Sequence, residues 1–208
     1  TKPLVYDADT GGISEHLVIN SSSLQRIGVS AIIIEDKVGL KKNSLLGNEV
    51  FQEQDSIESF ASKIKEVSRT KIHEEFMVIA RVESLILEAG IDDAINRAFA
   101  YVEAGADGIM IHSRKKTADE IFIFSKIFRK KYSNIPLICV PTSYNSVFED
   151  ELIDNGFNVV IYANQLLRAA YPAMYKTAES ILRNKRAFEA DQDLMSIKDI
   201  LKLIPGTV

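Results

Sequence analysis

The chain has 208 residues, which at about 150 residues per domain allows one large domain or, less comfortably, two small ones. Hydrophobic residues make up 46% and charged residues 26%, which are ordinary values for a globular protein and exclude a largely disordered chain. The 25 basic and 29 acidic side chains leave a net charge of −4, so the composition gives no electrostatic reason to expect a nucleic acid or an anionic membrane as partner.

The single cysteine, Cys139, excludes an internal disulfide framework and any metal site built from several cysteines. It lies within an apolar run, which favours a buried, inert thiol over a nucleophile. No window of the sequence approaches the ~20 apolar residues that a membrane span needs. We therefore expect a cytoplasmic protein without a membrane partner.

Short, almost continuous apolar runs alternate along the chain with longer segments of helical periodicity. Such runs are typical of parallel strands, because helices cover both faces of a parallel sheet. The clearest helical segment is residues 92–104, where apolar side chains recur at spacings of one, three and four. The alternation predicts a parallel α/β fold. The expected strands are residues 4–6, 31–34, 76–82, 108–111, 137–140 and 159–162.

The turns separate two kinds of parallel α/β fold. Gly28, Gly105 and Gly156 each stand between a helical pattern and the next strand, where a helix end favours a left-handed residue. An open dinucleotide-binding sheet would carry a G-x-G-x-x-G turn after its first strand. The turn here, residues 9–14, is D-T-G-G-I-S and does not match, and the sequence holds no P-loop.

Polar side chains stand at or just past the carboxyl end of each expected strand. A barrel gathers these ends around one mouth, which holds its active site, so we predict a (β/α)8 TIM-type barrel. A closed barrel has eight strands over about 250 residues. We therefore expect residues 1–208 to form a single, partial barrel domain, with about two strands upstream of Thr1. The strand-end residues are Asp7, Asp9, Glu35, Asp36, Arg81, Glu83, His112, Ser113, Thr142 and Asn164.

Three of these acids predict a metal site. Asp7 and Asp9 are two residues apart, so their side chains point to the same side of the strand end. Two carboxylates that face one cavity repel each other unless a cation or a shared proton lies between them. With Glu35 from the next strand they offer the hard oxygen ligands that suit Mg²⁺. The alternative is that such acids cap helices and turns, which is the better interpretation for one acid but not for three.

Arg81 and His112 each follow an apolar strand, where packing explains a polar side chain poorly. The arginine either pairs with Glu83 or Glu35, or offers its two-pronged guanidinium to the carboxylate or phosphoryl oxygens of a substrate. The histidine is either hydrogen-bonded in the core or part of the same anion site. Opposite a predicted Mg²⁺ site, the two together favour an anionic small-molecule substrate.

The segment of residues 36–48 is polar, contains two glycines and carries Lys37, Lys41 and Lys42. A long loop at a barrel mouth is often a lid that excludes water, although a solvated basic loop is the better interpretation of this segment in isolation. Farther on, the tail from Arg183 to Lys202 predicts two helices with a charged break at residues 189–191. Its apolar residues could pack on this chain or on a partner, so we expect residues 183–208 to be a possible oligomer contact.

Five ordered motifs resemble the phosphoenolpyruvate mutase branch of the isocitrate lyase superfamily, over essentially the whole chain. Residues 7–11, D-A-D-T-G, are similar to its D-x-D-T-G signature, and residues 35–37, E-D-K, to a strand end of that family. Residues 41–45, K-K-N-S-L, resemble its K-x-N-S-L gating loop. A-R-V-E at residues 80–83 and H-S at residues 112–113 resemble its A-R-x-E and H-S segments.

The resemblance implies a (β/α)8 barrel, usually with its last helices exchanged between subunits, and hence a homodimer or homotetramer. It implies Mg²⁺ near Asp7, Asp9 and Glu35, largely through waters. It implies reversible rearrangement of phosphoenolpyruvate to phosphonopyruvate, which begins phosphonate biosynthesis. By the same resemblance, Lys41 helps to close the loop, and the residues that contact the substrate are Arg81, His112, Asn43, Ser44 and Leu45.

The loop distinguishes the branches of this superfamily. Its carbon–carbon lyases carry a K-K-C-G-H type segment with a catalytic cysteine, which this chain lacks. Phosphonopyruvate hydrolase usually has threonine where Asn43 stands, so asparagine favours the mutase. The alternatives are the hydrolase, another lyase acting on a 2-oxo acid, a silent barrel that only binds a metal or partner, and one module of a fusion protein.

Overall fold

The structure is a computed structural model that describes residues 2–204 and 206, and at residues 47 and 48 it describes the backbone alone. Contacts between residues divide the chain into two compact units, Thr1–Tyr162 and Ala163–Val208. The barrel domain predicted for residues 1–208 and the oligomer contact predicted for residues 183–208 include four positions that lie outside the described residues, namely 1, 205, 207 and 208.

The first unit alternates strands and helices in the order that the sequence predicts. Short 3-10 helix η1 interrupts the alternation after the second strand. The strands are β1 (Val5–Asp7), β2 (Ala31–Glu35), β3 (Met77–Val82), β4 (Gly108–Ile111), β5 (Leu137–Cys139) and β6 (Val159–Val160). The helices are α1 (Ser14–Arg26), η1 (Ser44–Glu49), α2 (Ile57–Arg69), α3 (Ile91–Glu103), α4 (Asp119–Lys131) and α5 (Glu149–Asp154).

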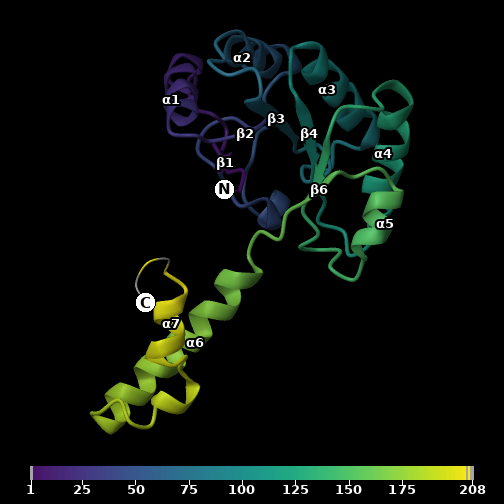
Figure 1. The fold of residues 1–208 in the computed structure, drawn as a ribbon. Coiled ribbons are helices and arrows are strands. Elements are labelled where there is room, and N and C mark those ends of the chain that lie inside the picture. Colours follow the sequence, from purple (N-terminus) through teal and green to yellow (C-terminus); the bar gives the residue numbers. More distant parts are fainter. Residues whose placement is uncertain (1, 205, 207–208) are drawn as a thin grey trace. The chain divides into compact units, whose positions relative to one another are not determined.

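Within the described residues the sheet contains six strands, all parallel, in the order β1-β2-β3-β4-β5-β6. Each strand therefore pairs with the next one along the chain, as in a (β/α) barrel, whereas a doubly wound sheet reverses its order at one point. Helices α1 to α5 lie along the outside of the strands (Figure 1). The predicted parallel α/β fold of the TIM type is confirmed, and strands upstream of Thr1 stay a prediction.

The strand ends differ from the predicted ones by no more than two residues. Strand β2 runs one residue farther, to Glu35, and β6 ends at Val160 instead of residue 162. The three predicted helix-ending glycines have φ angles of +88° at Gly28, +105° at Gly105 and +83° at Gly156. Only glycine adopts this conformation without strain, so the turn prediction is confirmed at all three positions.

Alternate residues of the strands enter two different apolar clusters. On β2 and β3, Ile32, Ile34, Val78 and Ala80 pack with the helices in the larger cluster. The residues between them, such as Ile33, form a smaller cluster with partners from β3 to β5 on the opposite face of the sheet. This opposite face is called the inner face below. Because side chains alternate along a strand, a residue at the strand end lies on the same face as the residue two positions before it.

The second unit consists of α6 (Gln165–Asn184), the 3-10 turn η2 (Asp191–Asp193) and α7 (Ile197–Lys202). The sequence predicted one domain and a helical tail that begins at Arg183, whereas the second unit begins at Ala163 and α6 ends one residue after Arg183. No residue of α6 is buried within the described chain. Its amphipathic pattern resembles that of helices α2 to α4, so the sequence offered no sign of a boundary there.

None of the described helices is both long enough and apolar enough to cross a membrane. This agrees with the hydropathy pattern of the sequence.

Helix α4 provides a test of the packing. Phe124 is fully buried, whereas its neighbour Ile123 is 49% exposed. We expect Phe124→Ala to lower the free energy of unfolding by about 3–5 kcal/mol, because it leaves a cavity between the helix and the sheet. The matched variant Ile123→Ala should change it by no more than roughly 0.5 kcal/mol. Urea unfolding followed by circular dichroism measures both, and equal losses would contradict the layered packing.

Candidate active site

The alternation of side chains brings the predicted residues of β2, β3 and β4 to one face. Glu35 follows the inner-face residue Ile33 by two positions, and Arg81 follows Ile79 by two. Glu35 and Arg81 are also direct neighbours in the register of the sheet. His112 stands two residues after Met110, which is in the same inner cluster. The carboxyl ends of these strands therefore present their charged side chains to the inner face.

Arg81 lies at the centre of a buried charged cluster. Its Nε donates to Glu83 Oε1 at 2.6 Å, its Nη2 donates to Ser44 Oγ at 2.5 Å, and its Nη1 lies 3.4 Å from Glu35 Oε2. The two interpretations of Arg81 are thus not exclusive, because it pairs with both glutamates while its guanidinium still has further N–H groups. Although burial alone would lower the pKa of Arg81, the charges of Glu83 and Glu35 raise it.

The two buried glutamates have opposite pKa shifts. Burial would raise the pKa of Glu83, but Arg81 and Lys37 lower it to about 2, so it is ionised at neutral pH. Burial raises the pKa of Glu35, and Arg81 only partly opposes this. Both Glu35 oxygens are buried and neither accepts a hydrogen bond in the structure, although Lys37 Nζ lies 3.2 Å from Oε1. Glu35 therefore has unused acceptor capacity that faces the site.

His112 is 6% exposed and lies near the positive charge of Arg81. Burial, with that charge, lowers its pKa to about 4, so the imidazole is neutral at physiological pH. Its Nδ1 is buried and has no hydrogen-bond partner in the structure. The alternative of a histidine hydrogen-bonded in the core therefore does not hold for this nitrogen. The nitrogen is available for a hydrogen bond with a ligand.

Asp7 and Asp9 form a more exposed pair at the end of β1, and Lys41 bridges them. Its Nζ lies 2.6 Å from Asp7 Oδ2 and 2.7 Å from Asp9 Oδ1. Burial would raise the pKa of Asp7, but the hydrogen bond and charge of Lys41 lower it. The two carboxylates thus hold the ammonium group of Lys41 between them in this structure, and Mg²⁺ at this position stays a prediction.

The loop that carries Lys41 places its next residues differently. Ser44 is buried, and its hydroxyl donates to Glu83 Oε2 at 2.6 Å. Asn43 and Leu45 are exposed, and Asn43 Oδ1 accepts from Leu45 N at 3.0 Å, which caps η1. The structure therefore brings Ser44 together with Arg81. Asn43 caps η1 through its Oδ1, and its amide NH₂ takes no part in this cap.

The predicted metal ligands fit Mg²⁺ by chemistry. Asp7, Asp9 and Glu35 supply carboxylate oxygens, and the oxygens of Glu35 have no hydrogen bond. Among the described residues, however, no three acidic, histidine or cysteine side chains are arranged as a ready-made metal site. This is compatible with Mg²⁺, which usually keeps several waters and needs only one or two direct carboxylates.

The sequence reasoning named Glu83 only as a possible partner of Arg81 and assigned no role to Lys37 or Asp36, and the structure places all three in or beside the site. Lys37 and Glu83 stand two residues after Glu35 and Arg81, so the same alternation could have found them. Asp36 stands between Glu35 and Lys37, so its side chain points to the other face of the sheet, toward the helices.

Asp36 connects the site to the helix layer. Its Oδ1 accepts from Glu83 N at 2.9 Å, and its Oδ2 accepts from Tyr101 Oη at 2.8 Å and from Gln54 Nε2 at 2.9 Å. Arg97 Nη1 lies 3.3 Å from the same oxygen. Complete burial raises the pKa of Asp36 to about 6 despite these partners. Tyr101 and Arg97 of helix α3 therefore hold the Asp36 carboxylate, and Asp36 in turn holds the backbone N–H of Glu83.

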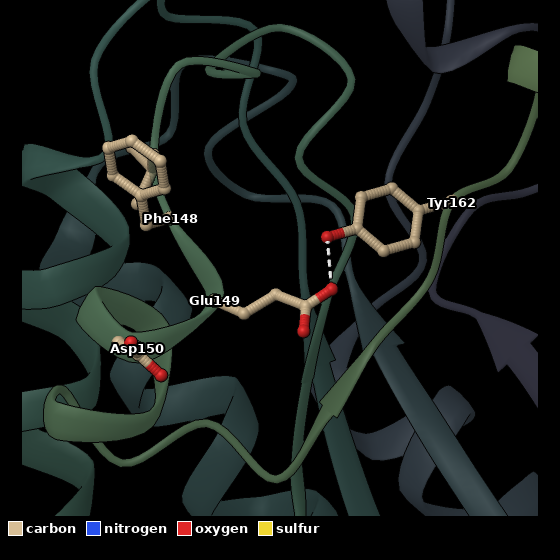
Figure 2. Close-up of a pocket in the computed structure, with 5 residues that line it drawn as sticks. Phe148, Glu149, Asp150 and Tyr162 are labelled. Carbon is tan, nitrogen blue, oxygen red and sulfur yellow. Dashed lines mark hydrogen bonds between the residues drawn. The ribbon is translucent and has the colours of Figure 1, made fainter.

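A separate hollow of about 400 Å³ lies where α5 begins and β6 ends (Figure 2). Tyr162 Oη donates to Glu149 Oε1 at 2.6 Å across it, and Phe148 beside it is 75% exposed. None of the predicted site residues lines this hollow. It gives no support to the charged cluster and belongs to another part of the barrel end.

Charged side chains gathered at the carboxyl ends of sequential parallel strands define an enzyme of the TIM-barrel type, and the motifs place it in the isocitrate lyase superfamily. A sequence model described as phosphoenolpyruvate phosphomutase matches residues 1–182. The chain belongs to the phosphoenolpyruvate phosphomutase family.

Relatives of two activities resemble the chain. Phosphonopyruvate hydrolase of Variovorax sp. (strain Pal2) is 39% identical over 205 residues, which cover 97% of this chain and 69% of that protein. Phosphoenolpyruvate phosphomutase of Tetrahymena pyriformis is 35% identical over 202 residues, which cover 97% of this chain and 66% of that protein. The chain thus spans about two thirds of the length of these curated relatives.

Solved structures of both activities share the fold. The crystal structure of phosphoenolpyruvate phosphomutase from Streptomyces platensis subsp. rosaceus has a TM-score of 0.90 and 32% identity, and it covers 98% of this chain and 69% of that one. The structure of phosphonopyruvate hydrolase in complex with oxalate and Mg²⁺ has a TM-score of 0.84 and 38% identity, with coverages of 97% and 68%.

The pKa of His112 gives a test of the buried site. Above pH 6.5 the imidazole is neutral in both the folded and the unfolded chain, but between pH 6.5 and about 4 only the unfolded chain binds the proton. Stability should therefore fall as the pH falls through this window, by roughly 3 kcal/mol for this residue. We expect His112→Gln to remove that part of the pH dependence.

The control is His73→Gln, which removes an exposed imidazole. Denaturant unfolding at pH 7.5 and pH 4.5 gives the difference for each variant, so any constant cost of the substitution cancels. An unaltered pH dependence in His112→Gln would contradict the placement of a neutral imidazole in the site.

Proposed function

We propose that this chain is the barrel of a Mg²⁺-dependent phosphoenolpyruvate mutase, which interconverts phosphoenolpyruvate and phosphonopyruvate. The observation that carries the proposal is Asn43. It stands in the loop directly before Ser44, whose hydroxyl contacts both Arg81 and Glu83. By the resemblance, the hydrolase usually has threonine at this position. An asparagine amide can donate two hydrogen bonds to a phosphoryl group, which threonine cannot do from its single hydroxyl.

The charges of the site support an anionic substrate only when a cation is bound. Four carboxylates face three cationic side chains, which leaves one net negative charge when all are ionised. A bound Mg²⁺ would reverse the sign and, as a Lewis acid, would polarise the oxygens of the substrate. The seven side chains are Asp7, Asp9, Glu35, Glu83, Lys37, Lys41 and Arg81.

Arg81 and His112 are suited to bind and orient the pyruvyl part of the substrate. Arg81 is fixed by its bond to Glu83, so its remaining N–H groups are directed without a loss of conformational entropy on binding. His112 is neutral and has an unpaired buried nitrogen, so it can share a hydrogen bond with a carbonyl oxygen without adding charge.

The loop of residues 38–53 is suited to exclude water. A transferring phosphoryl group requires positioning and positive charge, and it is lost to hydrolysis if water reaches it. Ser44 ties this loop to Arg81, and Lys41 ties it to Asp7. Closure of the loop over the substrate therefore separates a mutase from a hydrolase in physical terms.

Phosphonopyruvate hydrolase is the second candidate. It is favoured by the 39% identity to the Variovorax enzyme, against 35% to the Tetrahymena mutase. The two candidates share substrate, metal and fold, and they differ in whether water is kept from the phosphoryl group.

The first test follows phosphonopyruvate by ³¹P NMR in the presence of Mg²⁺ and the intact natural protein. We expect the signal of phosphoenolpyruvate to appear, with inorganic phosphate as a minor product at most. If inorganic phosphate and pyruvate form and phosphoenolpyruvate does not, the mutase proposal is wrong and the hydrolase is correct.

The role of Asn43 is tested by Asn43→Ser, because serine also caps helices but lacks the amide group. We expect a loss of kcat of roughly 100-fold, as for the removal of one donor to a transition-state charge. The control is Lys42→Ala, which changes the neighbouring exposed residue and keeps its backbone carbonyl. Full activity of Asn43→Ser would mean that Asn43 only caps η1.

Metal binding is tested by isothermal titration of the substrate-free protein with Mg²⁺. We expect Asp9→Asn to weaken binding by roughly 10-fold or more, because it removes a carboxylate that faces the metal. We expect Lys41→Met to strengthen binding, because its ammonium group lies between Asp7 and Asp9 and competes with the ion. Unchanged affinity in both variants would place the metal elsewhere.

A further inference from the structure

Lys37 is a buried lysine at the edge of the site whose role neither the motifs nor the proposed reaction explains. We propose that Lys37 is a positioning residue that fastens the loop of residues 38–53 over the barrel mouth. The benefit of such a fastening, the exclusion of water from a phosphoryl group, rests on the proposed function. The fastening itself rests on the contacts of one ammonium group.

On one side Lys37 is held by the strand ends. Its Nζ lies 3.2 Å from Glu35 Oε1 and 3.1 Å from Glu83 Oε2. The side chains of all three residues are at most 3% exposed. Buried ion pairs with hydrogen-bonding geometry hold their partners more firmly than surface pairs, so the sheet provides a fixed base for the ammonium group.

On the other side the same ammonium group contacts both limbs of the loop. On the outgoing limb it donates to Lys42 O and to Ser44 Oγ, both at 3.2 Å. On the return limb it donates to Gln52 Oε1 at 2.9 Å. One fixed cation thus joins two limbs of a loop that are ten residues of chain apart, from 42 to 52.

Apolar packing does not hold the tip of this loop. Its large apolar side chains, except for the partly buried Val50, are at least 41% exposed, so they contribute little burial. Lys41 does contact Asp7 and Asp9, but these three side chains are 30–58% exposed, and such pairs are weak in water. The buried polar contacts around Lys37 are therefore the stronger attachment. The exposed apolar side chains are Val38, Leu40, Leu45, Leu46 and Phe51.

The base of the loop is closed independently of the Lys37 side chain. The backbones of Lys37 and Gln54 form an antiparallel bridge, and Val38 N donates to Glu53 O at 2.9 Å. A variant that keeps the backbone and loses the ammonium group should therefore free the tip of the loop and leave its base in place.

The test is limited trypsin digestion of the full chain without substrate, with fragments identified by mass spectrometry. Trypsin cleaves after Lys41 and Lys42, which lie in the loop, and after Lys115, which lies in the exposed segment that follows β4. Because cleavage follows the population of the open loop, we expect Lys37→Met to increase the initial cleavage rate after Lys41 and Lys42 at least about tenfold. Cleavage after Lys115 should not change.

The matched control is Lys71→Met, which removes a partly buried lysine paired with Asp107 at the amino ends of the strands. It should leave cleavage after Lys41 and Lys42 as in the parent protein. Equal increases after Lys41 and Lys115 in Lys37→Met, or no increase in a folded Lys37→Met protein, would overturn the proposal. If Lys37→Met does not fold, Gln52→Met keeps the buried ion pairs, and it should still raise cleavage after Lys41 and Lys42.

This digestion needs neither substrate nor metal, so its result is independent of the reaction. If the loop is released in Lys37→Met and the natural protein still forms only inorganic phosphate, the fastening stands and the mutase proposal fails. If the loop is not released and phosphoenolpyruvate forms, the mutase proposal stands and the role of Lys37 fails.

Discussion

Side chains along a parallel strand point alternately to the two faces of the sheet, and the site depends on this alternation more than on any single contact. On β2, Ile34 packs with the helices while Ile33 faces inward, and the pattern continues beyond the strand end. Glu35 therefore joins the inner charged cluster and Asp36 joins the helix layer. A shift of one residue would exchange the two acids and disrupt both layers.

Burial of several charges is tolerated here because they neutralise one another. Glu35, Glu83, Lys37 and Arg81 are all less than a tenth exposed, and two acids face two bases. A buried ion pair gives little net stability, since desolvation offsets its attraction, but removal of one partner leaves an uncompensated charge. The cluster therefore fixes the geometry of the site more than it stabilises the fold. Ser44 adds a neutral bridge from the loop.

Burial and nearby charges together shift the pKa values of two neighbouring carboxyl groups, Asp36 and Glu83, in opposite directions. Burial raises the pKa of Asp36 to about 6, because its hydrogen bonds and Arg97 offset the loss of water only in part. Glu83 is buried too, but the close charges of Arg81 and Lys37 lower its pKa to about 2. Asp36 accepts a hydrogen bond from the backbone N–H of Glu83, and the Glu83 carboxylate in turn holds the guanidinium of Arg81. The helix layer thus supports the orientation of the guanidinium through two successive carboxylates.

Much of the fold was determined by the sequence itself, because the signals are local. Continuous apolar runs predicted six parallel strands to within two residues at each end, and Gly28, Gly105 and Gly156 predicted the left-handed helix ends. The strand-end motifs identified the superfamily, and they gathered Arg81, His112 and Glu35 correctly on adjacent strands. The division at Ala163 was not predicted, because an amphipathic helix has the same pattern whether its apolar face is covered or exposed.

Only the tertiary structure decided which partners meet. The sequence allowed Arg81 to pair with Glu83 or with Glu35, and the fold gave it both. The sequence assigned Mg²⁺ to Asp7 and Asp9, and it did not show that Lys41, from a loop more than thirty residues away, lies between them. It left Lys37 without a role, although five oxygens from the sheet and the loop surround its ammonium group. Periodicity fixes the face of the sheet on which a side chain lies, but long-range contacts depend on the path of the loop, which no local pattern encodes.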